Sequence, residues 1–145
     1  MEISRNKLHE KALIIIYQCL TFESLNTSYD IKEVISSNME LPFEDVDIYL
    51  RHVVVSALAH KEEAINAFTP NLKKWRFERL SLLLRSLLFL SYAQHYHLTN
   101  GDMDKKVIIN VAVNLAKTYL EKDDYKFVNA ILENTLKWNK VITTL

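Results

Sequence analysis

The sequence contains few of the residues that tight turns require. One glycine and two prolines occur in 145 residues. Because the two-residue turns of β-hairpins depend on glycine, or on residues that tolerate a positive φ, this scarcity disfavours a β-rich fold. We therefore expect an all-α protein.

Cysteine and net charge are also limited. Cys19 is the single cysteine, which excludes an intramolecular disulfide and a cysteine-based zinc site and fits a reducing compartment. Its expected role is that of a small apolar residue in the first helix. Lysine plus arginine and aspartate plus glutamate both number 18, so the formal net charge is zero. Any attraction to nucleic acid must therefore come from a local cluster of charges.

Long hydrophobic runs are missing as well. The longest apolar stretch, residues 80–92, is interrupted by Arg85 and is shorter than the roughly 20 residues that span a bilayer. Near the N-terminus, the apolar run of residues 12–16 is too short for the core of a signal peptide. Since 49% of the residues are hydrophobic, the chain can still bury a substantial core. We expect a cytoplasmic protein that does not contact membranes.

Apolar residues recur with the spacing of amphipathic helices along most of the chain. The first helix starts near Arg5 and presents one apolar face, made of Leu8, Ala12, Ile15, Ile16 and Cys19. Asp30 or Ser28 can cap a second helix, and Pro42 suits the first turn of a third helix that reaches Ala59 or beyond. Residues 62–68 either continue that third helix or form a separate one.

Three further helices are predicted over residues 81–96, 105–120 and 124–137. The apolar positions of the second of these include Tyr119. The links between the three helices are short, which favours antiparallel neighbours. The pattern as a whole predicts about seven helices.

Residue patterns typical of catalysis or cofactor binding are absent. The five histidines are His9, His52, His60, His95 and His97. They form no H-E-x-x-H pattern, and histidines two residues apart on a helix point to different sides. No serine lies in a G-x-S-x-G turn, and there is no glycine-rich phosphate loop. We expect no enzymatic activity, no metal and no cofactor.

Two sequence blocks stand out near the end of the chain: residues 104–117 read DKKVIINVAVNLAK and residues 123–133 read DDYKFVNAILE. In their residues and in the spacing between them, these blocks resemble the paired closing helices of the bacterial NusB family of transcription antitermination factors. The segments WRFERLS (75–81), RSLL (85–88) and ALIIIYQ (12–18) are similar to other family motifs. The resemblance covers most of the chain.

This resemblance implies two small, packed helical bundles within a single domain, residues 1–145, with subdomains of about 1–68 and 69–145. It also implies a scaffolding role without catalysis. NusB-like proteins pair with the small-subunit ribosomal protein NusE and bind the single-stranded boxA element of nascent RNA, chiefly ribosomal RNA, within the RNA polymerase antitermination complex. Some relatives self-associate through the same basic face, so a homodimer stays an open alternative.

Three segments are candidates for contact with RNA. The arginine-rich start of the family corresponds to the cationic residues Arg5, Lys7, His9 and Lys11. The start of the last helix contributes Lys126 as a phosphate contact and Phe127 as a ring that stacks on a base or belongs to the core. Asp123 or Asp124 is expected to cap this helix, beside the RNA path. Lys73 and Lys74 form either an auxiliary basic patch or only a solvated face. They lie beside Trp75, whose family position indicates packing.

The predicted partner surface lies on the first helix and near Arg85. At about 100° per residue, Tyr17 and Ile14 both fall well away from the apolar face of this helix, so both point outward. An exposed apolar pair of this kind suggests an interface. The resemblance implies NusE contacts at Tyr17 and at the segment before Arg85, where Leu84 replaces a frequent acidic residue.

A second class of function competes with RNA binding. Asn6 and His9 stand where the family has arginines, and the net charge is zero. These features are compatible with a diverged helical module that binds proteins but not RNA. The alignment of the basic residues with the family favours RNA.

Overall fold

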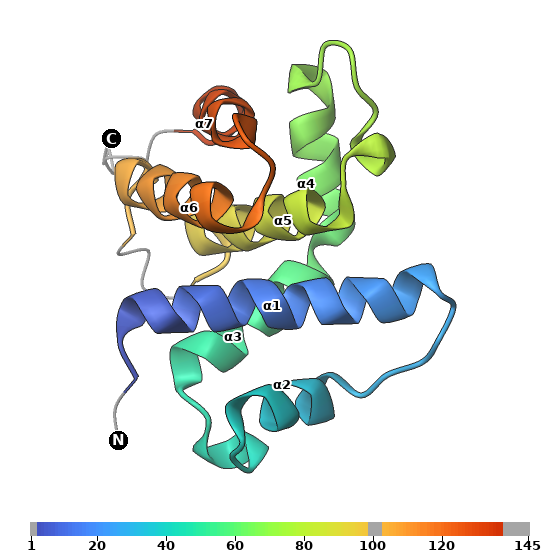
Figure 1. The fold of residues 1–145 in the computed structure, drawn as a ribbon, viewed down its shortest axis with the longest axis vertical. Coiled ribbons are helices and arrows are strands. Elements are labelled where there is room, and N and C mark those ends of the chain that lie inside the picture. Colours follow the sequence, from blue (N-terminus) through green and yellow to red (C-terminus); the bar gives the residue numbers. More distant parts are fainter. Residues whose placement is uncertain (1–2, 99–102, 138–145) are drawn as a thin grey trace, which may run out of the picture.

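The structure, a computed structural model, describes residues 3–98 and 103–137 (Figure 1). Seven α-helices follow one another: α1 (Arg5–Ser24), α2 (Ile31–Met39), α3 (Ile48–Ala59), α4 (Lys61–Phe68), α5 (Leu82–Tyr96), α6 (Lys105–Tyr119) and α7 (Asp124–Thr135). Three short 3₁₀ turns lie between them: η1 (Phe43–Asp45), η2 (Thr69–Asn71) and η3 (Phe77–Arg79). The described residues contain no strand, which confirms the all-α prediction.

Serine and aspartate side chains start several of these helices. Ser4, Asp30, Ser81 and Asp104 each accept a hydrogen bond from a backbone N–H in the first turn of the following helix. Such caps satisfy N–H groups that have no partner within the helix. The predicted cap of the second helix is therefore Asp30.

The start of the third helix differs from the prediction. Pro42 does not begin α3 but precedes the η1 turn. Asp47 caps α3 instead, since its carboxylate accepts from the N–H groups of Tyr49 at 2.8 Å and Leu50 at 3.2 Å. The helix ends after Ala59, and α4 begins at Lys61 as a separate helix.

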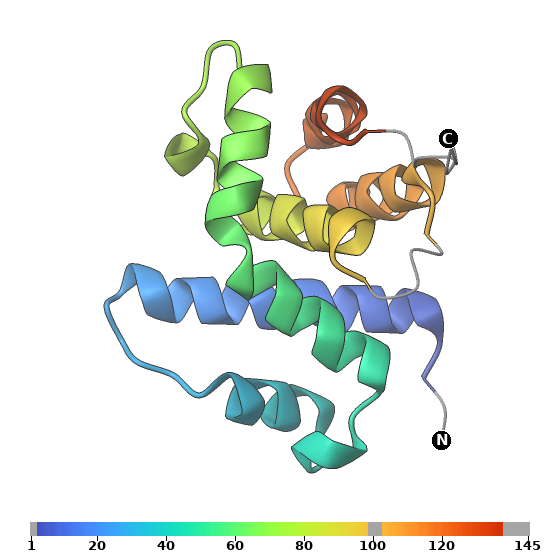
Figure 2. The same ribbon diagram turned by 180° about the vertical axis from the view of Figure 1, so that it is seen from behind.

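Two groups of helices pack on either side of a shared boundary (Figures 1 and 2). α1 packs against α2 and α3, while α6 packs against α7. α5 lies between these groups and contacts α1, α3, α4, α6 and α7. Because α5 packs against helices of both groups, the predicted subdomain boundary at residues 68 and 69 stays a prediction.

The core is one continuous hydrophobic cluster with members from all seven helices. The predicted apolar face of α1 is buried in it, including Cys19, which confirms the expected role of that residue. Burial in this cluster supplies most of the free energy of folding, since α-helices of this length are marginal in water without tertiary packing. None of the described helices is long and apolar enough to span a membrane.

Candidate nucleic-acid interface

The start of α1 exposes two of its predicted cations. Arg5 and Lys7 are both solvent-exposed. The Arg5 guanidinium lies 4.2 Å from the centre of the Tyr49 ring of α3, which orients it by a cation–π contact. The Lys7 ammonium lies 3.8 Å from the Glu10 carboxylate, an exposed ion pair that leaves it accessible to phosphate.

Lys11 is less available than the sequence suggests. It is half-buried, and its Nζ donates to the backbone carbonyl of Asn38 in α2 at 3.5 Å. The side chain thus bridges α1 and α2, so contact with RNA would compete with this bridge.

His9 does not fit the predicted phosphate contact. Its side chain is only 3% exposed, it meets the Tyr49 ring edge-on at 5.8 Å, and neither ring nitrogen has a hydrogen-bond partner. Burial, together with the nearby Arg5 charge, lowers the pKa of His9 to about 4. A neutral, buried imidazole cannot bind phosphate as a cation, and the prediction was wrong. His9 is buried because it lies three residues before Ala12 and so falls on the same, buried face of α1.

The start of α7 exposes Lys126 at the edge of a helix N-terminus. The Lys126 Nζ lies 3.6 Å from the Asp123 carboxylate, and both side chains are largely exposed. Asp123 takes a left-handed backbone conformation, with φ of 73°. Its side chain makes no capping hydrogen bond, and the Asp124 carboxylate accepts from Glu121 outside the helix. The predicted side-chain cap is therefore wrong, and Asp123 acts on this end through its charge.

Phe127 follows on the same turn of α7. It is partly buried and packs against the hydrophobic core. The core interpretation of this ring is therefore correct for part of its surface. The remainder is exposed, so stacking on a base stays a prediction.

α1, the end of α6 and the link to α7 lie on one side of the molecule, in front in Figure 1 and behind α3 and α5 in Figure 2. A direct bond joins them: the Tyr119 hydroxyl, at the end of α6, donates to the Glu10 carboxylate of α1 at 2.9 Å. We use the name α1/α7 surface for the exposed cations Arg5, Lys7 and Lys126 together with the partly buried Phe127.

Two residues on this side were not among the predicted RNA contacts. Tyr119 had been assigned to an apolar helix face, but it is 36% exposed, and its hydrogen bond to Glu10 raises its pKa. Lys117 lies with its ammonium 4.8 Å from the centre of the Tyr125 ring. The sequence feature that could have identified both residues is the recurrence of lysines and tyrosines around the link between α6 and α7.

A cleft of about 180 Å³ opens between α1 and α6 on this side. Its lining includes the side chains of Asn6 and His9 from α1 and Asn114 and Thr118 from α6. The His9 side chain therefore borders a cleft that amide and hydroxyl side chains also line.

Lys73 and Lys74 lie elsewhere, in an exposed link between η2 and η3 at the end of α4 that points away from α1 (Figure 1). Asn71, just before them, bonds Thr135 at the far end of α7 from Lys126, with 3.0 Å between Nδ2 and Oγ1. The structure therefore does not bring these lysines to the α1/α7 surface. Trp75 is 59% exposed, so the packing role expected for it was wrong.

The predicted partner surface is only partly present. Tyr17 is 39% exposed, in agreement with its predicted outward phase on α1, whereas Ile14, predicted to be exposed beside it, is half-buried. Leu84 is buried in the core, so it cannot form the predicted partner contact. The reason is that α5 is enclosed by five other helices. Arg85 is half-buried, and its Nε donates to the Leu80 carbonyl at 3.0 Å.

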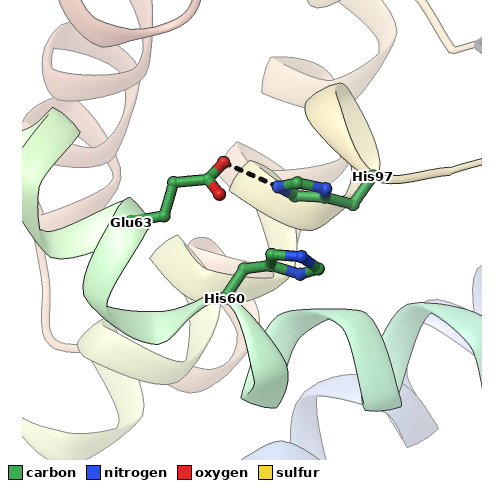
Figure 3. A group of neighbouring side chains, drawn as sticks. All are labelled: His60, Glu63 and His97. Atoms are coloured by element: carbon green, nitrogen blue, oxygen red, sulfur yellow. Dashed lines mark hydrogen bonds and ion pairs between the residues drawn. The ribbon is translucent and has the colours of Figure 1, made fainter.

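Spacing along the chain predicted no metal site, yet the fold brings three potential ligands together. They are His60, Glu63 and His97, none of which was predicted to bind RNA or a partner protein (Figure 3).

Comparisons with known proteins agree with this architecture. The NusB of T. maritima superimposes with a TM-score of 0.75 at 21% identity, covering 94% of this chain and 92% of that one, which shows the shared fold. The transcription antitermination protein NusB of Macrococcus caseolyticus is 30% identical over 135 residues, 93% of this chain and 98% of the relative. The protein of the same name from Listeria welshimeri is 30% identical over 132 residues, 91% of this chain and 95% of the relative.

The family model described as NusB family matches residues 6–137, from the second residue of α1 to just beyond α7. That match covers both helix groups and every residue of the α1/α7 surface except Arg5. It confirms the resemblance drawn from the closing helices. The NusB family is a family of transcription antitermination proteins and not of enzymes, and this chain belongs to it.

Proposed function

We propose that this protein is a cytoplasmic transcription antitermination factor without enzymatic activity. It binds boxA-type single-stranded RNA of nascent transcripts together with the small-subunit ribosomal protein NusE, as part of the RNA polymerase antitermination complex. The observation that carries the proposal is the match to the NusB family across nearly the whole chain, at residues 6–137.

The α1/α7 surface supports the RNA part of this proposal. Exposed cations at the start of α1 engage phosphates, and Lys126 does so beside the N-terminus of α7, where the helix dipole also favours anions. The exposed part of the Phe127 ring offers a face for an unpaired base. His9 and Lys11 are excluded from the main contacts because one is buried and the other bridges two helices.

The outward side of α1 supports the protein part. Tyr17 presents an aromatic ring with a polar end, a residue type enriched in protein interfaces. Ile14, one turn earlier, adds apolar surface beside it. We expect NusE to cover this pair and Arg85, whereas Leu84 acts through the core.

A titration of boxA RNA at several salt concentrations, with and without NusE, tests the proposal. We expect binding that strengthens when NusE is present and weakens as salt rises. For single-stranded RNA the slope of log K against log salt is roughly −0.7 per phosphate contact, so the variant Lys126→Ala should reduce the slope by about that amount. Lys32→Ala is the matched control. Lys32 lies in α2, which is on the other side of α1 from α7, so its removal should leave both RNA affinity and the salt slope unchanged.

The same titration separates the alternatives. If no RNA binds at low salt even with NusE present, the RNA proposal fails and a helical module that binds only proteins is favoured. Tyr17→Ala should abolish the strengthening by NusE but leave RNA binding by the protein alone intact. Sedimentation of the free protein, with and without RNA, determines whether a homodimer occupies the basic face.

A further inference from the structure

Three potential metal ligands meet where α3 passes into α4 (Figure 3). His60 lies between α3 and α4, Glu63 lies in the first turn of α4, and His97 directly follows α5. One ligand atom from each residue lies within 4.8 Å of the other two. Among residues 3–98 and 103–137, this is the one group of three or more His, Cys, Asp or Glu residues that could hold an ion.

Hydrogen bonds from neighbouring groups already orient two of the ligands. The His60 Nδ1 lies 2.8 Å from the Ser56 carbonyl oxygen, which can only accept, so Nδ1 carries the proton and Nε2 keeps its lone pair. The Tyr92 hydroxyl donates to the Glu63 Oε2 at 2.7 Å. Metal-binding histidines and carboxylates are commonly held by such partners, which fix the tautomer and the orientation of the ligand.

The third ligand faces the second. The His97 Nε2 lies 2.7 Å from the Glu63 Oε2 (Figure 3). The Glu63 carboxylate thus accepts from both Tyr92 and His97 and supplies the one acidic side chain of the group. The group therefore offers two imidazoles and one anionic oxygen, the donor set that catalytic zinc sites often use with one position left open.

The separation of the donor atoms suits one ion after a small adjustment. Ligand distances of about 2.1 Å in tetrahedral geometry place donor atoms about 3.4 Å apart. The present separations, from 2.7 Å to at most 4.8 Å, bracket that value. The His60 and His97 rings stack with centroids 3.5 Å apart at an angle of 7°. Because imidazole lone pairs lie in the ring plane, binding requires the rings to tilt out of this stack about their Cβ–Cγ bonds.

We propose that His60 through Nε2, Glu63 through its carboxylate and His97 through Nε2 bind one divalent transition-metal ion of the Zn²⁺ class, with water in the fourth position. The ion replaces the proton that His97 shares with Glu63. Because the ligands are partly exposed and must reorient, the ion exchanges with solvent.

The location gives this site a structural consequence. The ion ties the corner between α3 and α4 to the end of α5. In Figure 2 this corner is the point where the chain leaves the layer of α1 and α3 and enters the layer of α4 to α7. Metal binding therefore stabilises the relative placement of the two helix groups.

Isothermal titration of the full-length, untagged, chelator-treated protein with ZnCl₂ at neutral pH tests the site. We expect one equivalent of Zn²⁺ to bind, with affinity reduced at least about tenfold in His60→Ala and in His97→Ala. His52→Ala, which removes an exposed histidine two turns earlier on α3, is the matched control and should leave Zn²⁺ affinity within about twofold. Tyr92→Phe should weaken binding about tenfold through the lost orientation of Glu63.

A second measurement on the unmodified protein does not depend on the folding of variants. Zn²⁺ should shift the ring nitrogen resonances of His60 and His97 in NMR spectra, and those of His52 should stay in place. The proposal is overturned if binding is not saturable, or if His97→Ala and His52→Ala change the affinity equally. Because none of these residues lies on the α1/α7 surface, RNA affinity should be the same with and without Zn²⁺, and each proposal can fail alone.

Discussion

Two basic and aromatic regions of this molecule differ in how their residues are placed. The 73–76 loop has the denser charge along the chain, with two lysines, a tryptophan and an arginine in a row. The α1/α7 surface has the same number of cations, Arg5, Lys7 and Lys126, but takes them from residues more than a hundred positions apart. In the second region a hydrogen bond between Tyr119 and Glu10 links α1 to α6, the helix that leads into α7, whereas the 73–76 loop lies at the end of α4. A dense run of charged residues in the sequence is thus a poor guide to which charges the fold places on the same side of the molecule.

The largest expected effect concerns the buried histidine that underlies the α1/α7 surface. Unfolded His9 takes up a proton below about pH 6.5, whereas folded His9 stays neutral down to about pH 4. Between these values the unfolded state binds more protons, so stability falls as pH falls. At pH 4 the loss should be about 3 kcal/mol relative to neutral pH.

Urea unfolding of the natural protein and of His9→Phe across this pH range measures the effect. The variant keeps a ring against Tyr49 but cannot titrate, so its curve should fall less steeply by that amount. Parallel curves for the two proteins would show that His9 does not cause the loss of stability at low pH. A buried titrating residue would then no longer distinguish the α1/α7 surface from the 73–76 loop.

The comparison between the regions is tested directly by removing their cations. The triple variant Arg5→Ala, Lys7→Ala and Lys126→Ala should lower boxA affinity about 100-fold at low salt, because each charged phosphate contact contributes roughly 1 kcal/mol. The double variant Lys73→Ala and Lys74→Ala should lower it less than about threefold. Equal losses, measured by fluorescence titration in the presence of NusE, would contradict the distinction.

The aromatic residues of the two regions allow a finer test. Phe127→Leu should weaken RNA binding about tenfold through lost stacking, since one base on an aromatic ring contributes about 1–3 kcal/mol. Trp75→Leu, although it removes the more exposed ring, should change affinity less than about twofold. Thermal unfolding of both variants is the control, because Phe127 also packs on the core. A stronger loss with Trp75→Leu would place the RNA on the 73–76 loop.

The smallest effect is expected at the link within the α1/α7 surface. Tyr119→Phe removes the hydroxyl that donates to Glu10, an exposed hydrogen bond, and should lower the free energy of unfolding by less than about 1 kcal/mol. Chemical denaturation of this variant, of Glu10→Gln and of the double variant isolates the interaction. A coupling energy of zero would mean that α1 and α6 are held together by packing alone.

Much of the helical architecture could be predicted because its signals are local. Asp30, Ser81 and Asp104 cap helices through bonds to N–H groups two or three residues away. The start of α3 was missed because two signals competed, and Asp47 with two capping bonds overrode the preference of Pro42 for a first turn.

The candidate site was predicted less completely, since exposure depends on distant neighbours. Tyr17 was placed outward correctly from its phase on α1. His9 and Leu84 were placed on the surface by their correspondence with the family, and the packing of α3 against α1 and of five helices around α5 buries them. Trp75 shows the opposite error, an aromatic residue expected in the core that lies in an exposed link.

By itself, the sequence determined the helical class, the amphipathic faces, most helix starts and the family, because each rests on residue types at short separations. Only the tertiary structure decided which cations share a surface, that His9 is neutral, and that His60 and Glu63 meet His97 across more than thirty residues. These outcomes depend on packing between distant helices, where burial and a neighbouring charge set the chemistry of a side chain.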